Sequence, residues 1–127
     1  MRLSMLILAL LVSGAAVPAV AGPLEDGRTA HDKGDYVTAL RLWLPLAEQG
    51  NAVAQYNVGG MYASSRGVPR DYVQAYKWFN LTASRSSGSQ NDLRELAIKG
   101  RDLVATRMTP AEVAEAQKLA REWKPKP

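Results

Sequence analysis

GDYVTALRLWLPLAEQG at residues 34–50 and RDYVQAYKWFNLTASRS at residues 70–86 are two copies of one sequence pattern. Five of the 17 aligned positions are identical, where ordinary composition gives roughly one by chance. The identical pairs are Asp35/Asp71, Tyr36/Tyr72, Val37/Val73, Ala39/Ala75 and Ala47/Ala83. A repeat of this length indicates a helical solenoid or a propeller, because each unit buries its apolar face against its neighbours.

Helical signals decide between these two architectures. Asp35 and Asp71 each stand directly before an apolar-periodic run, where a carboxylate can accept from free backbone N–H groups. Sustained alternation of apolar and polar residues, the mark of strands, is absent. Each copy therefore predicts a helix, with apolar residues at i, i+4, i+7 and i+8 in the first: Ala39, Trp43, Leu46 and Ala47. A second helix is expected after Gly50, with one face formed by Ala54, Val58, Met61 and Tyr62.

Packing between these helices is predicted from their large and small residues. The aromatic residues at repeat positions are assigned to the core, because aromatic side chains dominate cores by buried area; they are Trp43, Tyr62, Trp78 and Phe79. Gly59 and Gly60 stand inside the second helix, where each costs about 1 kcal/mol of helix propensity. We expect close backbone approach of a neighbouring helix at this pair.

The rest of the chain keeps a helical period without the repeat. A stripe at i, i+3, i+4, i+7, i+10 and i+11 predicts another helix, with its buried face formed by Leu93, Leu96, Ala97, Gly100, Leu103 and Val104. Thr109, Pro110 and Glu112 form the start signal of a last helix with a capping box. Residues 22–127 are thus predicted to be one helical-repeat domain, with a capping helix at 24–33, a first repeat at 35–70, a second, degenerate repeat at 71–106 and a capping helix at 109–123.

The first 21 residues match a secretory signal peptide. Arg2 gives a positive start, LILALLV at 6–12 is an uninterrupted apolar run, and Ala19-Val20-Ala21 is a cleavage pattern. The apolar run is too short for a membrane anchor, which needs ~20 apolar residues. We therefore expect cleavage after Ala21 and a periplasmic or secreted protein.

Composition excludes several kinds of site. The chain has no cysteine and one histidine, so disulfides, thiolate metal sites, iron–sulfur clusters and multi-histidine metal sites are excluded. His31-Asp32 is the one neighbouring His/Asp pair, and adjacent helical residues do not face each other. No phosphate-binding loop, zinc-protease or serine-hydrolase motif occurs. The prediction is a protein that is not an enzyme, with no catalytic residue, cofactor or metal.

Net charge is modest but unevenly distributed. Residues 22–65 carry a net charge of −2 and residues 66–127 a net charge of +5. A surplus of this size without a concentrated basic face does not indicate nucleic-acid binding. The second half could prefer an acidic partner, although a solvated helical surface accounts for most such patterns.

The ordered residues from 34 to 83 resemble the Sel-one-like repeat (SLR) family, a relative of the tetratricopeptide repeat. The matching residues are Gly34, Asp35, Tyr36, Ala39, Trp43, Leu46, Ala47, Gly50, Ala54, Gln55, Gly59, Met61, Tyr62, Gly67, Val68, Asp71, Tyr72, Ala75, Trp78 and Ala83. Val58, Ser65 and Thr82 depart from the family pattern, and Ser65 stands where the family has a glycine. The resemblance implies an all-α fold, a short right-handed α-solenoid of antiparallel helix pairs with helical caps, and a scaffold or adaptor role in protein complexes.

The resemblance also suggests where a partner could bind. Helices that lead each repeat line the concave side of such solenoids, and equivalent rows of the two copies place two basic groups together. We predict partner contact by Arg41, Tyr76, Lys77 and Asn80, with the cations receiving an acidic side chain or a peptide C-terminus. The predicted role is an exported protein–protein interaction module that binds a peptide or protein in the cell envelope, as a monomer or weak homodimer.

Two other kinds of function stay open from the sequence. One is binding of a small ligand in the envelope, or action on peptidoglycan. The other is structural self-association through Trp123 and the apolar face around it, if that face is uncovered. The sequence does not identify the partner.

Overall fold

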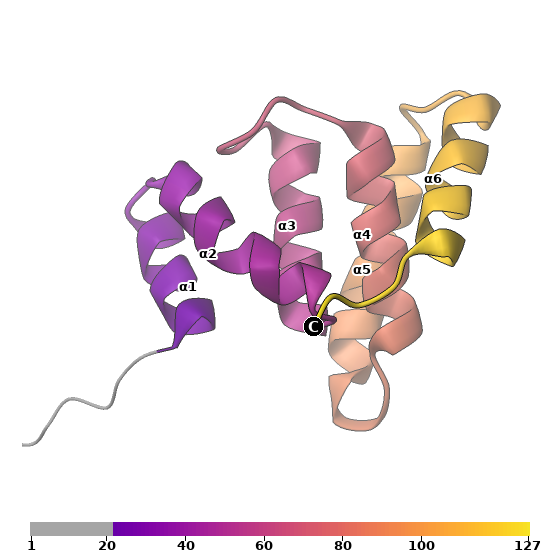
Figure 1. The fold of residues 1–127 in the computed structure, drawn as a ribbon. Helices are drawn as coiled ribbons and strands as arrows, with labels where there is room; N and C mark the ends of the chain where they lie inside the picture. Colours follow the sequence, from indigo (N-terminus) through magenta and orange to yellow (C-terminus); the bar gives the residue numbers. More distant parts are fainter. Residues whose placement is uncertain (1–21) are drawn as a thin grey trace, which may run out of the picture.

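The computed structural model describes residues 22–127, which form six α-helices, one short 3₁₀ helix and no strand (Figure 1). The elements are α1 (Pro23–Asp32), α2 (Tyr36–Glu48), α3 (Ala52–Ser64), α4 (Tyr72–Arg85), η1 (Gly88–Gln90), α5 (Asn91–Ala105) and α6 (Pro110–Glu122). The predicted signal peptide at 1–21 lies outside the described residues. No helix from residue 22 onward is long and apolar enough to cross a membrane.

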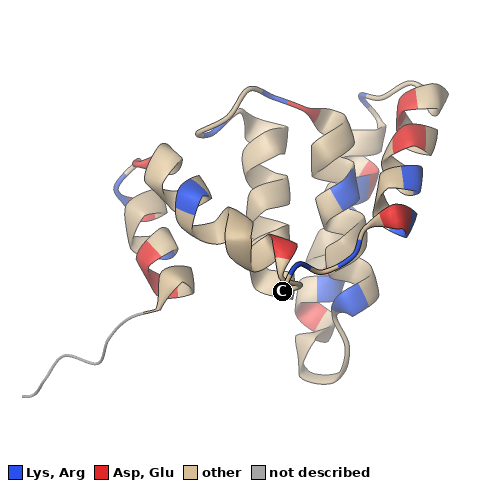
Figure 2. Ribbon diagram, in the orientation of Figure 1, with Lys and Arg blue, Asp and Glu red and all other residues tan. Residues whose placement is uncertain are grey.

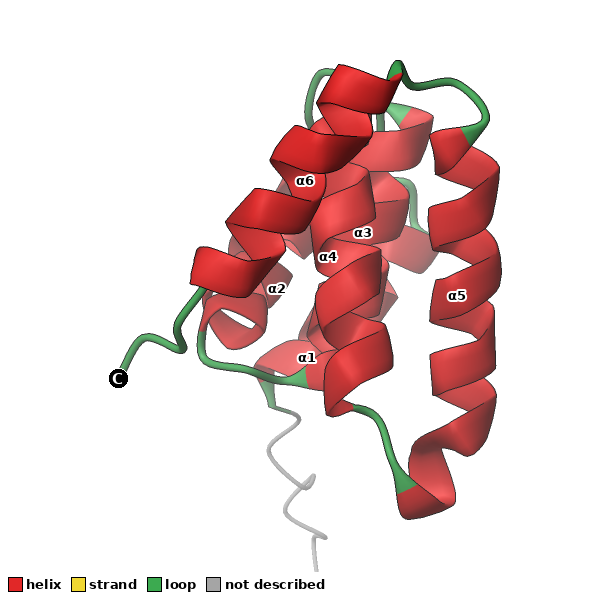
Figure 3. Ribbon diagram, turned by 90° about the vertical axis from the view of Figure 1, so that its right-hand side faces the viewer, coloured by secondary structure: helices red, strands yellow, loops and turns green. Residues whose placement is uncertain are grey.

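Each of the first four α-helices packs against the next α-helix in the chain, which confirms the predicted helical solenoid. Helices two apart also touch, α3 with α5 and α4 with α6, so the array has two layers. The last helix departs from simple alternation, because α6 packs chiefly on α4 and not on α5, its neighbour in the chain. Figure 3 shows α4 between α5 and α6.

The helix ends follow the residues that predicted them. Asp35 accepts from the Thr38 N–H at 3.3 Å, and Asp71 accepts from the Gln74 N–H at 3.1 Å. Thr109 and Glu112 form the predicted capping box. These side chains satisfy N–H groups that have no partner within the helix, so α2, α4 and α6 begin where the sequence places their caps.

The core contains the aromatic residues that the repeat assigns to it. Trp43, Trp78 and Phe79 are buried, and Tyr62 is half-buried against both core clusters. The predicted stripe on α5 is only partly buried, however. Ala97 and Val104 are buried while Leu96 and Leu103 are exposed, because α6 packs on α4 and leaves this edge of α5 uncovered.

The two adjacent glycines of α3 differ in what surrounds them. A methyl group on Gly59 would lie 2.9 Å from a ring carbon of Phe79 and 3.3 Å from Cβ of Trp78. A methyl group on Gly60 would meet nothing within 4 Å. Close approach of α4 is therefore the reason for glycine at position 59, and the same expectation is wrong for position 60.

The C-terminal residues fold back over α4 and reach the end of α2 (Figure 1). The rings of Trp123 and Trp78 lie 6.4 Å apart, edge to face, and the Arg85 guanidinium lies 5.1 Å from the Trp123 ring centroid. The Lys126 N–H donates to the Glu48 carbonyl at 2.8 Å, and its ammonium pairs with the Glu48 carboxylate at 2.7 Å. The face around Trp123 is therefore packed against the protein itself.

Candidate functional site

The four predicted contact residues do not form one open row. Arg41 is exposed on α2, Lys77 and Asn80 are half-buried on α4, and Tyr76 is only 7% exposed. The repeat pattern shows which positions of α2 and α4 are equivalent. It does not show that α5, α6 and the C-terminal residues pack over α4.

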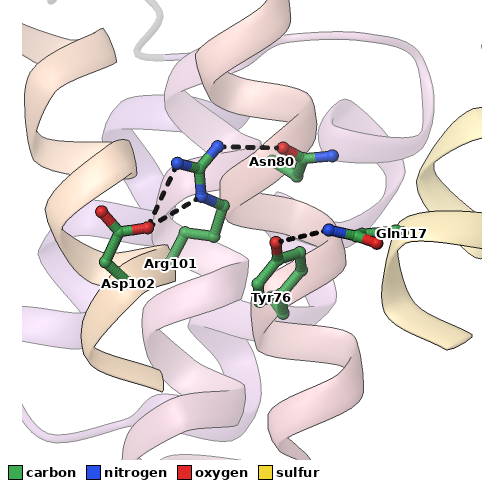
Figure 4. A network of polar contacts seen from close by, with 5 residues as sticks. All are labelled: Tyr76, Asn80, Arg101, Asp102 and Gln117. Atoms are coloured by element: carbon green, nitrogen blue, oxygen red, sulfur yellow. Dashed lines mark hydrogen bonds and ion pairs between the residues drawn. The ribbon is translucent and has the colours of Figure 1, made fainter. Parts of the chain in front are cut away.

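Tyr76 and Asn80 are engaged within the protein (Figure 4). The Gln117 amide of α6 donates to the Tyr76 hydroxyl at 3.3 Å. The Arg101 guanidinium of α5 donates to the Asn80 side-chain oxygen at 3.3 Å and pairs with Asp102 at 3.1 Å. Tertiary packing therefore covers most of Tyr76 and engages the side-chain oxygen of Asn80, and partner contact by these two residues stays a prediction.

Lys77 is half-buried and lies near the charged side chains of Glu48, Asp71 and Lys126. Its ammonium is 4.1 Å from the Trp78 ring centroid, within range of a cation–π contact. Burial lowers the pKa of Lys77 below its usual 10.5, and the nearby carboxylates of Glu48 and Asp71 partly oppose this effect. Partner contact by Arg41 and Lys77 stays a prediction, with only Arg41 freely accessible.

A larger open site lies elsewhere, between α1 and α3. This α1–α3 groove has a volume of about 570 Å³. Helix α1 contributes polar and charged side chains to one wall, α3 contributes the other wall, and Trp43 of α2 reaches the site from between them. The lining residues are Leu24, Glu25, Arg28, His31, Asp32, Trp43, Val53, Tyr56, Asn57, Gly60, Ser64 and Arg66.

Aromatic contacts hold the α1 wall of the groove in place. The Trp43 indole N–H donates to the Leu24 carbonyl at 3.0 Å. The His31 ring lies 5.0 Å from the Tyr36 ring and 5.6 Å from the Trp43 ring. The Arg66 guanidinium lies 5.3 Å from the Tyr36 ring centroid. Together these contacts tie α1, α2 and the α3–α4 loop into one preformed wall.

The chemistry of the groove is mixed. Arg28 and Arg66 bring positive charge, Glu25 and Asp32 bring negative charge, and Tyr56 adds an aromatic surface. His31 and Asp32 come no closer than 4.0 Å, and no group of three potential metal-ligating side chains occurs between residues 22 and 127. Mixed charge with an aromatic wall suits a peptide, whose backbone and side chains carry both donors and acceptors.

The sequence prediction missed this groove because it treated residues 24–33 as a cap and placed the contact surface on α2 and α4. The available signal was Gly60, a helix-interior glycine whose cost in helix propensity is offset by no packing against the rest of the protein.

The helix pairs of this chain match a known repeat family. The Sel1 repeat family matches residues 24–51 and 52–87, about half of the chain, so the chain belongs to this family. These two units correspond to α1 with α2 and to α3 with α4. Sel1 repeats generally mediate protein–protein interactions, and proteins built from them are generally scaffolds without enzymatic activity. No curated protein matches the chain.

Among solved structures, the chain is similar to a protective antigen present in uropathogenic Escherichia coli strains, whose crystal structure displays an SLR fold. The TM-score is 0.68 at 28% sequence identity. The match covers 80% of this chain and 21% of the other, so this chain spans about a fifth of the length of that antigen.

Proposed function

We propose that this chain is an exported interaction module that binds a peptide segment of a partner protein in the α1–α3 groove. The family supports the general role, because Sel1 repeats generally mediate protein–protein interactions. The signal-peptide pattern of residues 1–21 supports export to the cell envelope, and the absence of cysteine is compatible with an oxidising compartment.

The observation that carries the proposal is the open floor of the groove at Gly60. A methyl group there would meet nothing within 4 Å, although a helix-interior glycine costs about 1 kcal/mol relative to alanine. Absence of a side chain at this position does not improve packing, but it leaves room for the backbone of a bound segment. The two walls then present Tyr56 and Arg66 to its side chains.

The length of the array limits the size of the partner surface. Helices α1 and α3 supply most of the lining, with Trp43 of α2 and Arg66 of the α3–α4 loop, and a volume of about 570 Å³ accommodates a short segment and not a whole domain. We therefore expect one extended or helical segment of the partner as the ligand.

The test is crosslinking in intact cells, followed by affinity capture and mass spectrometry. Gly60→Leu adds a side chain to the groove floor at a position where a methyl group meets nothing within 4 Å, so we expect loss of the dominant partner without loss of fold. Ala114→Leu is the matched control, because Ala114 is exposed on α6 and does not line the groove. Retention of the same partner by the Gly60→Leu variant would contradict binding in this groove.

The same experiment separates the other functions. Self-crosslinks alone would favour a structural homo-oligomer. Absence of any partner, together with a rise in melting temperature upon addition of an envelope ligand, would favour small-ligand binding. The Arg41→Ala, Lys77→Ala double variant tests the surface predicted from the sequence in parallel.

A further inference from the structure

A second, smaller pocket lies where the C-terminal ends of α3 and α5 approach the start of α4. This α3–α5 pocket has a volume of about 270 Å³ and is lined by Ala63, Arg70, Tyr72, Leu103, Val104 and Arg107. None of these residues lines the α1–α3 groove, so the two sites are separate.

One apolar side chain of the pocket, Leu103, is exposed and not packed into the core. Leu103 is 69% exposed, although the adjacent Val104 is buried against α4. Leu96, two turns earlier on the same edge of α5, is 48% exposed. Leu96 and Leu103 therefore give this edge of α5 apolar side chains that no part of residues 22–127 covers.

Two arginines flank this apolar surface without forming an ion pair among residues 22–127. Arg70 and Arg107 are both exposed, and the Arg70 guanidinium lies 5.8 Å from the Tyr72 ring centroid. Arg101, by contrast, is neutralised by Asp102 at 3.1 Å. Figure 2 shows basic segments in the α3–α4 and α5–α6 loops at the same end of the array.

We propose that the α3–α5 pocket binds an apolar side chain of a partner protein, in a segment that carries carboxylates on both sides of that side chain. The apolar side chain lies against Leu103 and Val104, and the flanking carboxylates pair with Arg70 and Arg107. Guanidinium groups match carboxylates in geometry as well as in charge. The net charge of +5 on residues 66–127 adds a longer-range attraction for an acidic segment.

This inference rests on the proposed function only in that the ligand is a protein segment. It differs in site and in specificity, because the α1–α3 groove has charges of both signs while the α3–α5 pocket has basic charges alone. The two sites can therefore fail or succeed separately.

The test uses the purified protein, labelled with ¹⁵N, and the synthetic peptide acetyl-Asp-Glu-Leu-Glu-Asp-amide. We expect amide chemical-shift changes centred on residues 70–72 and 103–107, and weaker binding as salt is raised. Replacing the peptide leucine by alanine, or its four acidic residues by lysine, should abolish these changes. No shift at millimolar peptide, or equal binding of the lysine peptide, would overturn the proposal.

Substitutions of pocket residues test whether the acidic peptide binds in the α3–α5 pocket. Arg107→Glu and Leu103→Ser should each weaken peptide binding by about tenfold, because one reverses a flanking charge and the other removes the apolar contact. Arg94→Glu is the matched control, since Arg94 is exposed on the same helix but does not line the pocket. Both pocket positions are exposed, so circular dichroism should show an unchanged fold.

The outcomes distinguish this site from the groove. Gly60→Leu should leave binding of the acidic peptide unchanged, even when it removes the partner captured in cells. If the Gly60→Leu variant loses that partner and the acidic peptide does not bind the protein, the result supports binding in the α1–α3 groove and refutes binding in the α3–α5 pocket. Concentration-dependent shifts of the pocket residues without peptide would show that a second copy covers it, which also rejects the proposal.

Discussion

The adjacent glycines of α3 allow a direct test of how this array packs. Gly59→Ala and Gly60→Ala add the same methyl group to neighbouring positions of one helix. Each gains about 1 kcal/mol of helix propensity, so this contribution cancels when the two variants are compared. The methyl group at position 60 meets open space, and at position 59 it lies 2.9 Å from the Phe79 ring.

The expected difference follows from that contact. Gly60→Ala should stabilise the protein by about 1 kcal/mol. Overpacking of a close-packed helix contact costs about 1–3 kcal/mol, so Gly59→Ala should range from nearly neutral to about 2 kcal/mol less stable than the wild type. The two variants should therefore differ by about 1–3 kcal/mol, with a difference in melting temperature of about 4–8 °C for each kcal/mol.

Urea unfolding at equilibrium measures this difference, with the midpoint shifting and the slope unchanged. Phe79→Leu provides a second measurement, because a smaller side chain should relieve the crowding that the Gly59→Ala methyl group creates. The combined variant should be more stable than the sum of the two single effects predicts. Equal stability of Gly59→Ala and Gly60→Ala would refute the close approach of α3 and α4 at Gly59.

Three further predictions concern the turn after α3, the half-buried Lys77 and the C-terminal residues. Ser65 has a left-handed backbone with φ of 59°, so Ser65→Gly should raise the free energy of unfolding by about 1 kcal/mol, measured by urea unfolding. Because burial lowers the pKa of Lys77, the unfolded chain binds more protons than the folded chain just below pH 10.5, and the stability contributed by Lys77 rises with pH there. Lys77→Met removes this titration, so any advantage of that variant in melting temperature should shrink as the pH approaches 10.5; a pH-independent difference would contradict it. Trp123→Ala removes the edge-to-face contact with Trp78 and should cost about 2 kcal/mol, roughly half the value for a fully buried tryptophan, with a lowered melting temperature as the readout.

The helices and their order could be predicted from the sequence because those signals are local. Asp35 and Asp71 cap their helices a few residues away, and Thr109 with Glu112 does the same within one turn. The repeat then indicates how such helices stack, since equivalent positions meet equivalent neighbours. The repeat predicts Trp43 and Trp78 in the core on that basis, and both are buried.

The candidate sites could not be predicted in the same way. The sequence placed Tyr76 and Asn80 on a contact surface, but α6 covers one and Arg101 of α5 binds the other. The path of α6 over α4 depends on contacts between residues far apart in the chain, such as Gln117 with Tyr76. Local periodicity contains no information about such contacts.

The sequence by itself determined the fold class, the starts of the helices capped by Asp35, Asp71 and Thr109, and the membership of a repeat family, because caps, periodicity and repeats act over one or two helices. Tertiary structure alone decided which surfaces stay open. It left the floor at Gly60 and the edge at Leu103 uncovered, and it placed α6 against Tyr76 of the predicted row. A helix has several apolar and polar faces, and only the packing of its distant neighbours determines which of them remains available to a partner.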